Sequence, residues 1–387
     1  MSGILSNIYN NTSFALRLHS EAMARLQEQI STGSRINRAS DEPSAAHQIL
    51  RLNSQEVSLE NCIDNISGVI STLEFSSTTI DSIKSALGKA RARLTGISAS
   101  SGATGIAEEI NNWLEDVASL ANTSYLDQYL FGGSDTASAP YLVERTNGKI
   151  TSITYQGSFE DRNIEVAPGV ESSAFYVGDN VFRSNNRSDP IFPGAAGTGA
   201  ENGTGTSSVK GDVWLTITGT AGNYDLSIDG GLSTFNTNGT DTNLAVTDSR
   251  TGEVLYVDTT GIASAGVDWI RVPGTYDIFN TLIALRDRLE SGGDIQEIRS
   301  NGLQALEEVY ELLIQKSVSV GAKMGFLDDL RDNLTRIKWD TEDEVARLED
   351  ADIAQIAIDL SRRGVLYQMS LALTAEIMSM SLLDFIT

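Results

Sequence analysis

The chain has 387 residues and a mass of 41.6 kDa, which suits two or three domains. Asp and Glu number 52 against 28 Lys and Arg, so the formal net charge is −24. This charge makes nucleic acid and an anionic membrane poor partners, and we expect neither. The chain has one cysteine, Cys62, which is too few for a disulfide within the chain or a thiolate metal cluster. It has two histidines, His19 and His47, which leaves few residues for a catalytic triad. We therefore expect no enzyme activity, no metal and no cofactor.

The N-terminal segment begins without the features of a cleavable secretion signal. Residues Met1–Asn7 carry no basic stretch and no apolar core, and no segment of the chain reaches the ~18 consecutive apolar residues of a membrane span. Further on, small and apolar residues recur at helical spacing, which predicts an amphipathic helix with a narrow apolar stripe. The stripe consists of Ala15, Leu18, Ala22, Leu26 and Ile30.

A corner is predicted directly after this helix, over Ile30–Ala46. Gly33 suits the left-handed position that ends a helix, Asp41 can cap the next helix, and Pro43 suits its first turn. The corner would leave Arg35 and Arg38 exposed. In so acidic a chain, we expect these arginines to pair with acidic groups on another copy.

The next helix carries the seam of a coiled coil. Apolar residues from Leu59 to Leu73 and from Ile80 to Ile97 alternate in steps of three and four, which gives the coiled-coil period of 3.5 residues. The register is expected to slip once, at Ser76–Thr79. At 1.5 Å per residue, the segment from Leu59 to Ile97 would be a rod of roughly 55–60 Å.

The middle of the chain is predicted to be β-rich. Of 34 glycines, 21 lie between Gly132 and Gly274, together with five of the six prolines, and both residue types disfavour helix interiors. Alternating runs separated by turn residues predict antiparallel strands in a sandwich or small barrel. These runs are 149–155, 163–166, 213–218, 224–228 and 253–257. The Gly-, Thr- and Ser-rich segment 193–210 is expected to be a flexible loop.

The C-terminal flank repeats the seam. It runs from Ile278 to Leu289, breaks at 291–294, resumes from Leu303 to Leu327, and returns from Leu366 to Leu383 with Glu376 as a polar intruder. The fold class we predict is therefore mainly α with a β insert: the two flanks form an antiparallel long-helix bundle or coiled coil around a central antiparallel β domain. The chain ends would lie side by side, and their thin stripes suggest helices that stay disordered until neighbouring copies cover them.

The corner, with Ser31-Thr32-Gly33, Arg35-Ile36-Asn37, Asp41 and Pro43, resembles the corner of the flagellin superfamily, and Ser319–Lys323 with Leu348–Ala354 resemble its C-terminal counterpart. Within that superfamily the sequence is most similar to the hook-associated protein 3 family, which joins hook to filament. The segments that resemble this family are 129–134 with Pro140-Tyr141, 153–158, 178–182 and 380–386.

The resemblance implies a secreted structural protein of the extracellular bacterial flagellum, exported by the type III route and assembled as helical rings. It implies partners in other copies of the chain, an adjacent hook-associated protein on the hook side, flagellin on the filament side, and an export chaperone for the C-terminal region. Three parts follow: terminal helices 1–35 and 350–387 in an inner tube, a helical rod 36–139 and 274–349, and an outer β-rich domain 140–273. The expected assembly interface is Ile4, Ile8, Ala15, Leu18, Ala22, Leu26, Ile30, Arg35, Asn37, Arg38, Asp41, Pro43, Asp350, Asp352, Leu366, Met369, Leu373, Met380, Leu383 and Phe385.

Two alternatives remain open. The chain could be the filament subunit, flagellin, because the corner motif does not separate the two. The β insert could also carry an enzyme or a sugar-binding module, although it contains no histidine and no convergent pair of acids that we identify.

Overall fold

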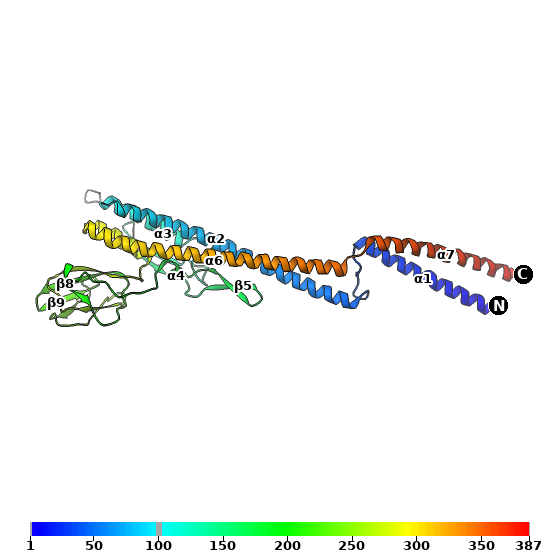
Figure 1. The fold of residues 1–387 in the computed structure, drawn as a ribbon, viewed down its shortest axis with the longest axis horizontal. Helices are drawn as coiled ribbons and strands as arrows, with labels where there is room; N and C mark the ends of the chain where they lie inside the picture. Colours follow the sequence, from blue (N-terminus) through cyan, green and yellow to red (C-terminus); the bar gives the residue numbers. More distant parts are fainter. Residues whose placement is uncertain (1, 98–102, 387) are drawn as a thin grey trace. The chain divides into compact units, whose positions relative to one another are not determined.

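The computed structural model describes the backbone of residues 2–97 and 103–386, and the side chains of 10–97 and 103–376. Both flanks are helical and the middle is built of strands, as the sequence predicts (Figure 1). The chain divides into two compact units, residues 1–64 with 330–387 and residues 65–329. Among the residues that the structure describes, no helix is both long and apolar enough to cross a membrane.

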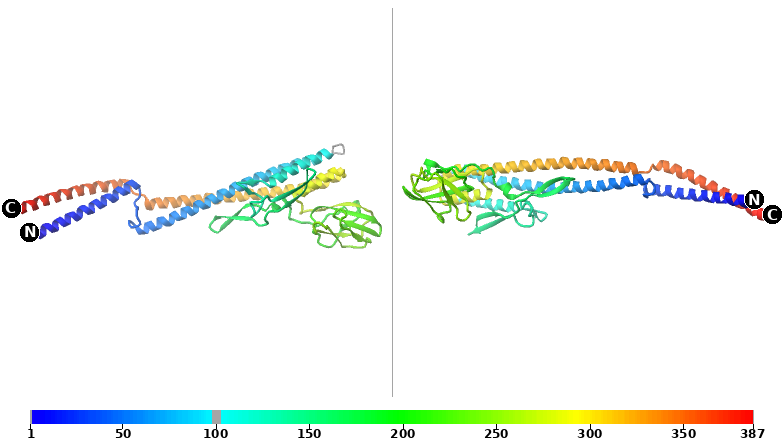
Figure 2. Two further views of the ribbon diagram at one scale, coloured as in Figure 1. Left: turned by 180° about the vertical axis from the view of Figure 1, so that it is seen from behind. Right: turned by 90° about the horizontal axis from the view of Figure 1, so that it is seen from below.

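The first unit contains the paired terminal helices. Helix α1 spans Ser2–Thr32 and helix α7 spans Ile353–Ile386, and the two pack along each other. Both chain ends lie at the same end of this pair in every view (Figures 1 and 2). The antiparallel return of the chain is thus confirmed. The unit also holds the start of α2, where Glu60 pairs with Lys338 of α6 at 3.3 Å.

Helix α2, Pro43–Thr95, keeps one seam without the predicted slip. Val69 and Ser76 are both buried, and they complete a run of alternating three- and four-residue steps. That run is Ile66, Val69, Leu73, Ser76, Ile80, Ile83, Leu87, Ala90 and Leu94. The Ser76 hydroxyl donates to the Thr72 carbonyl at 3.0 Å, so its polar group is satisfied inside the helix. The expected slip was wrong because a serine can occupy a seam position in this way.

The C-terminal flank has the predicted break. Helix α5, Ile278–Glu290, is followed by the long helix α6, Ile295–Glu349. Buried residues in α6 recur every seven positions, at Leu306, Leu313, Val320, Leu327, Leu334 and Thr341. Within the second unit, Arg91 of α2 pairs with Glu307 of α6 at 2.8 Å. Helix α3, Ala103–Ala121, packs on α5.

The β region contains five small antiparallel sheets. One has the order β10-β9-β8-β13 and another β11-β12-β7, and their apolar side chains share one core, as in a sandwich. The pairs β1–β2, β3–β4 and β5–β6 are hairpins. The strands are β1 Ser124–Tyr125, β2 Gln128–Tyr129, β3 Tyr141–Thr146, β4 Lys149–Tyr155, β5 Arg162–Ala167, β6 Val170–Phe175, β7 Glu201–Asn202, β8 Gly211–Thr220, β9 Asn223–Ser227, β10 Phe235–Thr237, β11 Leu244–Thr247, β12 Val254–Asp258 and β13 Gly266–Val272; short helices are α4 Gly178–Phe182 and η1 Gly194–Ala196.

The segment 193–210 corrects the sequence analysis, because it is packed and not a free loop. Thr198 is buried, and its N–H and hydroxyl both donate to the Asp268 carboxylate, at 2.9 and 2.6 Å. A Cβ at Gly205 would meet the Tyr256 ring at 2.4 Å, so this glycine allows close packing of the segment on β12. Composition suggested flexibility, whereas the small residues serve tight contact.

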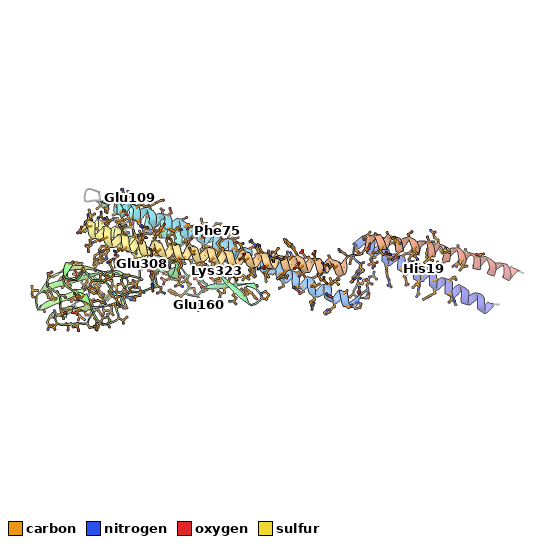
Figure 3. The ribbon with its side chains drawn as sticks, in the orientation of Figure 1. His19, Phe75, Glu109, Glu160, Glu308 and Lys323 are labelled. Carbon is orange, nitrogen blue, oxygen red and sulfur yellow. The ribbon has the colours of Figure 1, made fainter. Side chains whose placement is uncertain are left out.

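The strand region is joined to the helices by side-chain contacts. Glu308 of α6 accepts the N–H of Gly274 at 2.9 Å, just after β13 (Figure 3). Lys323 of α6 lies over the ring of Tyr176, 5.3 Å from its centroid. Both contacts lie within the second unit, so the long helix positions the strands that pack beside it.

Candidate assembly interface

The corner begins where α1 ends. Gly33 follows the helix with φ +74°, and its N–H donates to the Gln29 carbonyl at 2.9 Å. A glycine in this left-handed conformation satisfies one of the last helical carbonyls without a steric penalty. The predicted helix end at Gly33 is therefore confirmed.

The corner is bonded to the connection between α6 and α7. Arg35 donates its backbone N–H to Glu349 O at 2.6 Å, and Ala351 donates to Gly33 O at 3.0 Å. Between these bonds, Ser34 and Asp350 form an antiparallel bridge. The two chain connections, far apart in sequence, are thus joined by backbone hydrogen bonds.

The corner arginines both find partners within the chain. Arg35 donates through Nη2 to the Leu348 carbonyl at 2.9 Å, near the C-terminal end of α6, where a cation is favourable. It also lies 3.4 Å from the Glu42 carboxylate, and Arg38 pairs with Glu28 at 3.2 Å. Both guanidinium groups remain partly exposed, so their pairing with another copy stays a prediction.

Three further predicted residues shape the corner. The Asp41 carboxylate accepts the N–H of Arg38 at 2.9 Å, while α2 begins at Pro43. Asp41 therefore closes the loop and is not the residue that caps α2, because the tight turn from Arg38 brings that N–H within its reach. The Asn37 amide donates to the carbonyl of Ser34 at 3.1 Å.

At the start of α7, by contrast, an aspartate does cap the helix. The Asp352 carboxylate accepts the N–H of Gln355 at 3.0 Å, which is the geometry of a helix N-cap. Its neighbour Asp350 contributes backbone to the bridge with Ser34. Asp350 and Asp352, both expected at the assembly interface, therefore stabilise the connection between α6 and α7.

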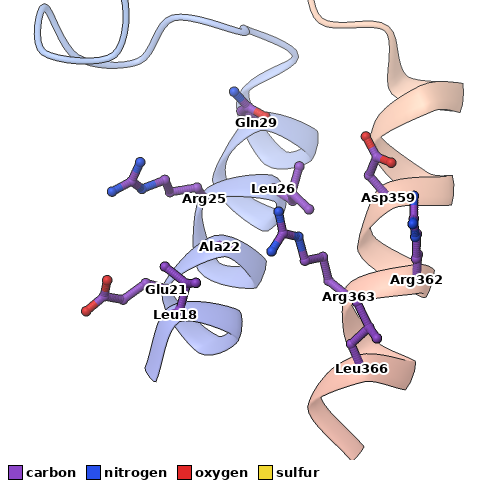
Figure 4. Close-up of a pocket in the computed structure, with 10 residues that line it drawn as sticks. All are labelled: Leu18, Glu21, Ala22, Arg25, Leu26, Gln29, Asp359, Arg362, Arg363 and Leu366. Carbon is purple, nitrogen blue, oxygen red and sulfur yellow. The ribbon is translucent and has the colours of Figure 1, made fainter. Parts of the chain in front are cut away.

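A groove lies between α1 and α7, with a volume of about 580 Å³ (Figure 4). Four of the expected residues line it together: Leu18, Ala22, Leu26 and Leu366. The polar part of its lining was not foreseen, and comprises Glu21, Arg25, Gln29, Asp359, Arg362 and Arg363. In Figure 4, Arg363 extends from α7 toward α1 near Leu26.

The apolar residues of the terminal helices are covered only in part by their pairing. Leu18 is 50% exposed and Met369 is 63% exposed, while Leu373 and Ile30 are also exposed and Ala15 is half-buried. Sequence reasoning missed others that are equally exposed, namely Phe14, Ile358 and Val365. The side chains of Ile4, Ile8, Met380, Leu383 and Phe385 lie outside the described residues.

Away from the helices, one acid with a raised pKa is Asp212, where β8 meets α5. Burial raises its pKa to about 6, although the Tyr276 hydroxyl donates to it at 2.7 Å. It borders a cavity of about 290 Å³ between the strands and α5. Among the side chains the structure describes, no three His, Cys, Asp or Glu residues are grouped so that they could hold a metal ion.

The chain is similar to known proteins in part of its sequence and in its fold. Residues 5–136 match the family model of the bacterial flagellin N-terminal helical region. No curated protein matches the chain. A putative flagellar hook-associated protein from Vibrio parahaemolyticus has a TM-score of 0.51 at 14% identity, covering 80% of this chain and 100% of that one. Flagellar hook associated protein-3 from Legionella pneumophila has a TM-score of 0.50 at 17% identity, covering 78% and 99%.

At these identities the structural likeness is one of fold. The family match covers α1, α2 and α3, together with the corner whose hydrogen bonds are described above. Residues 5–136 thus match the model of the bacterial flagellin N-terminal helical region, and the chain shares its fold with these two solved hook-associated proteins.

Proposed function

We propose that this chain is a structural subunit of the bacterial flagellum that joins hook to filament by assembling with copies of itself through its terminal helices. The observation that carries the proposal is the α1–α7 pair, whose apolar side chains stay exposed after pairing. The flagellin N-terminal region and the fold shared with hook-associated proteins support it. The proposed role is structural and needs no reaction.

The physical reason for assembly is the unsatisfied apolar surface. Fully burying a Leu, Ile, Met or Phe side chain contributes about 1.5–3 kcal/mol, and each half-exposed residue offers part of that. Residues such as Phe14, Leu18, Val365 and Met369 would each be covered by a neighbouring copy. Because binding to the ordered helices favours them over unfolded chain, assembly would stabilise helices that are marginal alone.

The proposal gives each of the three parts of the chain a place in the assembly. Residues 1–35 and 350–387 would form the inner tube, residues 36–139 and 274–349 the rod, and residues 140–273 the outer domain. The neighbours would be an adjacent hook-associated protein on one side and flagellin on the other. The protein would reach the extracellular flagellum by type III export, with a chaperone for its C-terminal region.

Deletion of the chain from its bacterium tests the role. We expect hooks to form and flagellin to be secreted as monomers, with no filaments. Filaments that still grow would contradict the proposal, and a major band of this chain in sheared filaments would favour the filament subunit instead.

A double variant tests the terminal surface. Leu18→Asp with Leu366→Asp places two charges in the groove, and it should fail to restore filaments in the deletion strain because buried carboxylates are costly. Leu232→Asp is the matched control, since Leu232 is 69% exposed in the β region. Full restoration by the groove variant would refute assembly through α1 and α7.

A further inference from the structure

We propose that the groove between α1 and α7 receives the acidic C-terminal turns of α6 from a second copy of this chain. The inference rests on the proposed self-assembly and names the contact that aligns neighbouring copies. It concerns two surfaces of the first unit, the groove lining in Figure 4 and residues 340–350 of the α6 end.

The groove lining holds three arginines and two acids, Glu21 and Asp359, so its net charge is positive although the chain as a whole is acidic. Arg25, Arg362 and Arg363 line it, and among the described side chains none of the three has a carboxylate oxygen within 4 Å. One of the two acids in the lining, Glu21, is already paired with Arg17 at 3.5 Å. In a chain of net charge −24, three guanidinium groups gathered at one groove favour an anionic occupant.

The end of α6 offers the complementary surface. Residues 340–350 contain six acids and one base, Arg347. The base is engaged by Glu344 at 3.6 Å, and Lys338 one turn earlier is shared between Glu60 and Glu342. Among the described residues, the exposed carboxylates of Asp340 and Asp343 have no such ion pair.

The occupant is a second copy because the chain does not bring its own two surfaces together. No ion pair joins the groove arginines to the acids of α6 within the described residues. Asp343 and Arg363 are twenty positions apart, which corresponds to about 30 Å along helices at 1.5 Å per residue. A neighbouring copy displaced axially by that distance would set the acids of one beside the arginines of the other.

Such a contact is heterologous, since each copy offers its groove to one neighbour and its acidic turns to another. Heterologous contacts generate rings when the rotation closes and helical assemblies when it does not. Charge complementarity fixes the register between copies, while burial of the apolar residues supplies most of the free energy. The contact therefore explains how copies with long, similar seams would align axially.

Charge reversal tests the contact in the purified full chain. Arg362→Glu with Arg363→Glu, and separately Asp340→Lys with Asp343→Lys, should each raise the concentration needed for self-association by about tenfold or more, measured by sedimentation velocity. The fourfold variant that combines both reversals should return to within about twofold of the wild type. Arg51→Glu with Lys89→Glu removes equal charge from exposed positions of α2 and is the matched control.

Each outcome decides between the hypotheses. If either charge-reversed variant associates like the wild type, or the fourfold variant fails to recover, the groove does not take α6 of a second copy. The same holds if the purified wild type never associates, or if raised salt leaves association unchanged. The deletion phenotype and the Leu18→Asp, Leu366→Asp variant decide the proposed function separately, so it can stand when this contact fails.

Discussion

Replacing Arg286 by methionine should loosen the attachment of the β3–β4 hairpin to the helices. Arg286 in α5 is only 2% exposed, and its Nη1 donates to the Ile150 carbonyl at 2.6 Å and to the Asn111 amide oxygen at 2.9 Å. One charged group thus links α5, β4 and α3. Its counter-ion, Asp287 at 2.7 Å, is mostly exposed.

The magnitude follows from the acceptors that remain. Methionine retains much of the volume but leaves the Ile150 carbonyl and the Asn111 side chain without their donor. A buried group that loses its hydrogen bond costs about 1–3 kcal/mol, so we expect a loss of about 2–5 kcal/mol. Because a chain of two units need not unfold in one step, the assay is amide hydrogen exchange of β4 and α3 in the full chain.

The control and the refutation use the exposed partner. Asp287→Asn should cost less than Arg286→Met, because the asparagine oxygen can still accept from the guanidinium and the Ile150 carbonyl and the Asn111 amide oxygen keep their donor. Buried ion pairs can be replaced by apolar groups without loss when no polar group is stranded. If Arg286→Met leaves exchange in β4 unchanged, the carbonyl of Ile150 does not depend on the guanidinium and the reasoning is wrong.

Three further predictions concern single residues. Asp212→Asn should stabilise the β region at pH 7.5, because the pKa of Asp212 is raised from 3.8 to about 6 and the folded state binds the proton more tightly than the unfolded chain. The wild type therefore gains stability as pH falls through 6, and urea unfolding followed by tryptophan fluorescence should show the difference narrowing below pH 6 and closing only below the unfolded pKa of 3.8. Gly33→Ala meets no neighbour within 4 Å but keeps φ +74°, so it should weaken the corner by about 1 kcal/mol, seen as faster exchange of the Arg35 amide, and an unchanged rate would count against backbone strain. Ser76→Asp buries a charge in the seam and should lower the unfolding temperature sharply, whereas the exposed Thr78→Asp should not.

The helical flanks could be predicted because their seams repeat over many turns. Leu87 and Leu94 in α2, or Leu313 and Val320 in α6, are apolar and regularly spaced, so the pattern alone indicates buried positions. The apolar pattern does not identify Ser76 as a buried seam position. A hydroxyl looks polar in sequence, but its bond to the Thr72 carbonyl makes it compatible with the core.

The corner was predictable from local chemistry, and its attachment was not. Gly33 and Pro43 have conformational preferences that act within a few residues, so their roles follow from sequence. The bridge between Ser34 and Asp350 joins segments more than 300 positions apart, and only the fold brings them together. Asp41 was misassigned because its carboxylate accepts the N–H of Arg38, three residues earlier, and sequence does not show that the turn brings this N–H close to it.

The groove arginines were missed for a related reason. Arg362 and Arg363 stand on a helix surface, where a charge is usually solvated, and nothing local indicates which face of α7 meets α1. Arg25, which lines the same groove, lies on α1. A site formed between two helices becomes visible only when the axial alignment of those helices is known.

The distribution of charge supports the proposed role of the terminal helices. Helix α1 contains two arginines and two acids, and α7 contains two arginines and three acids, so the pair carries −1 and the remainder of the chain −23 of the net −24. Like charges repel, so copies of the acidic remainder would keep apart in dilute solution. The nearly neutral pair can approach its counterparts closely with little repulsion. Because apolar burial then acts where electrostatic repulsion is weakest, association between copies is expected to begin at α1 and α7.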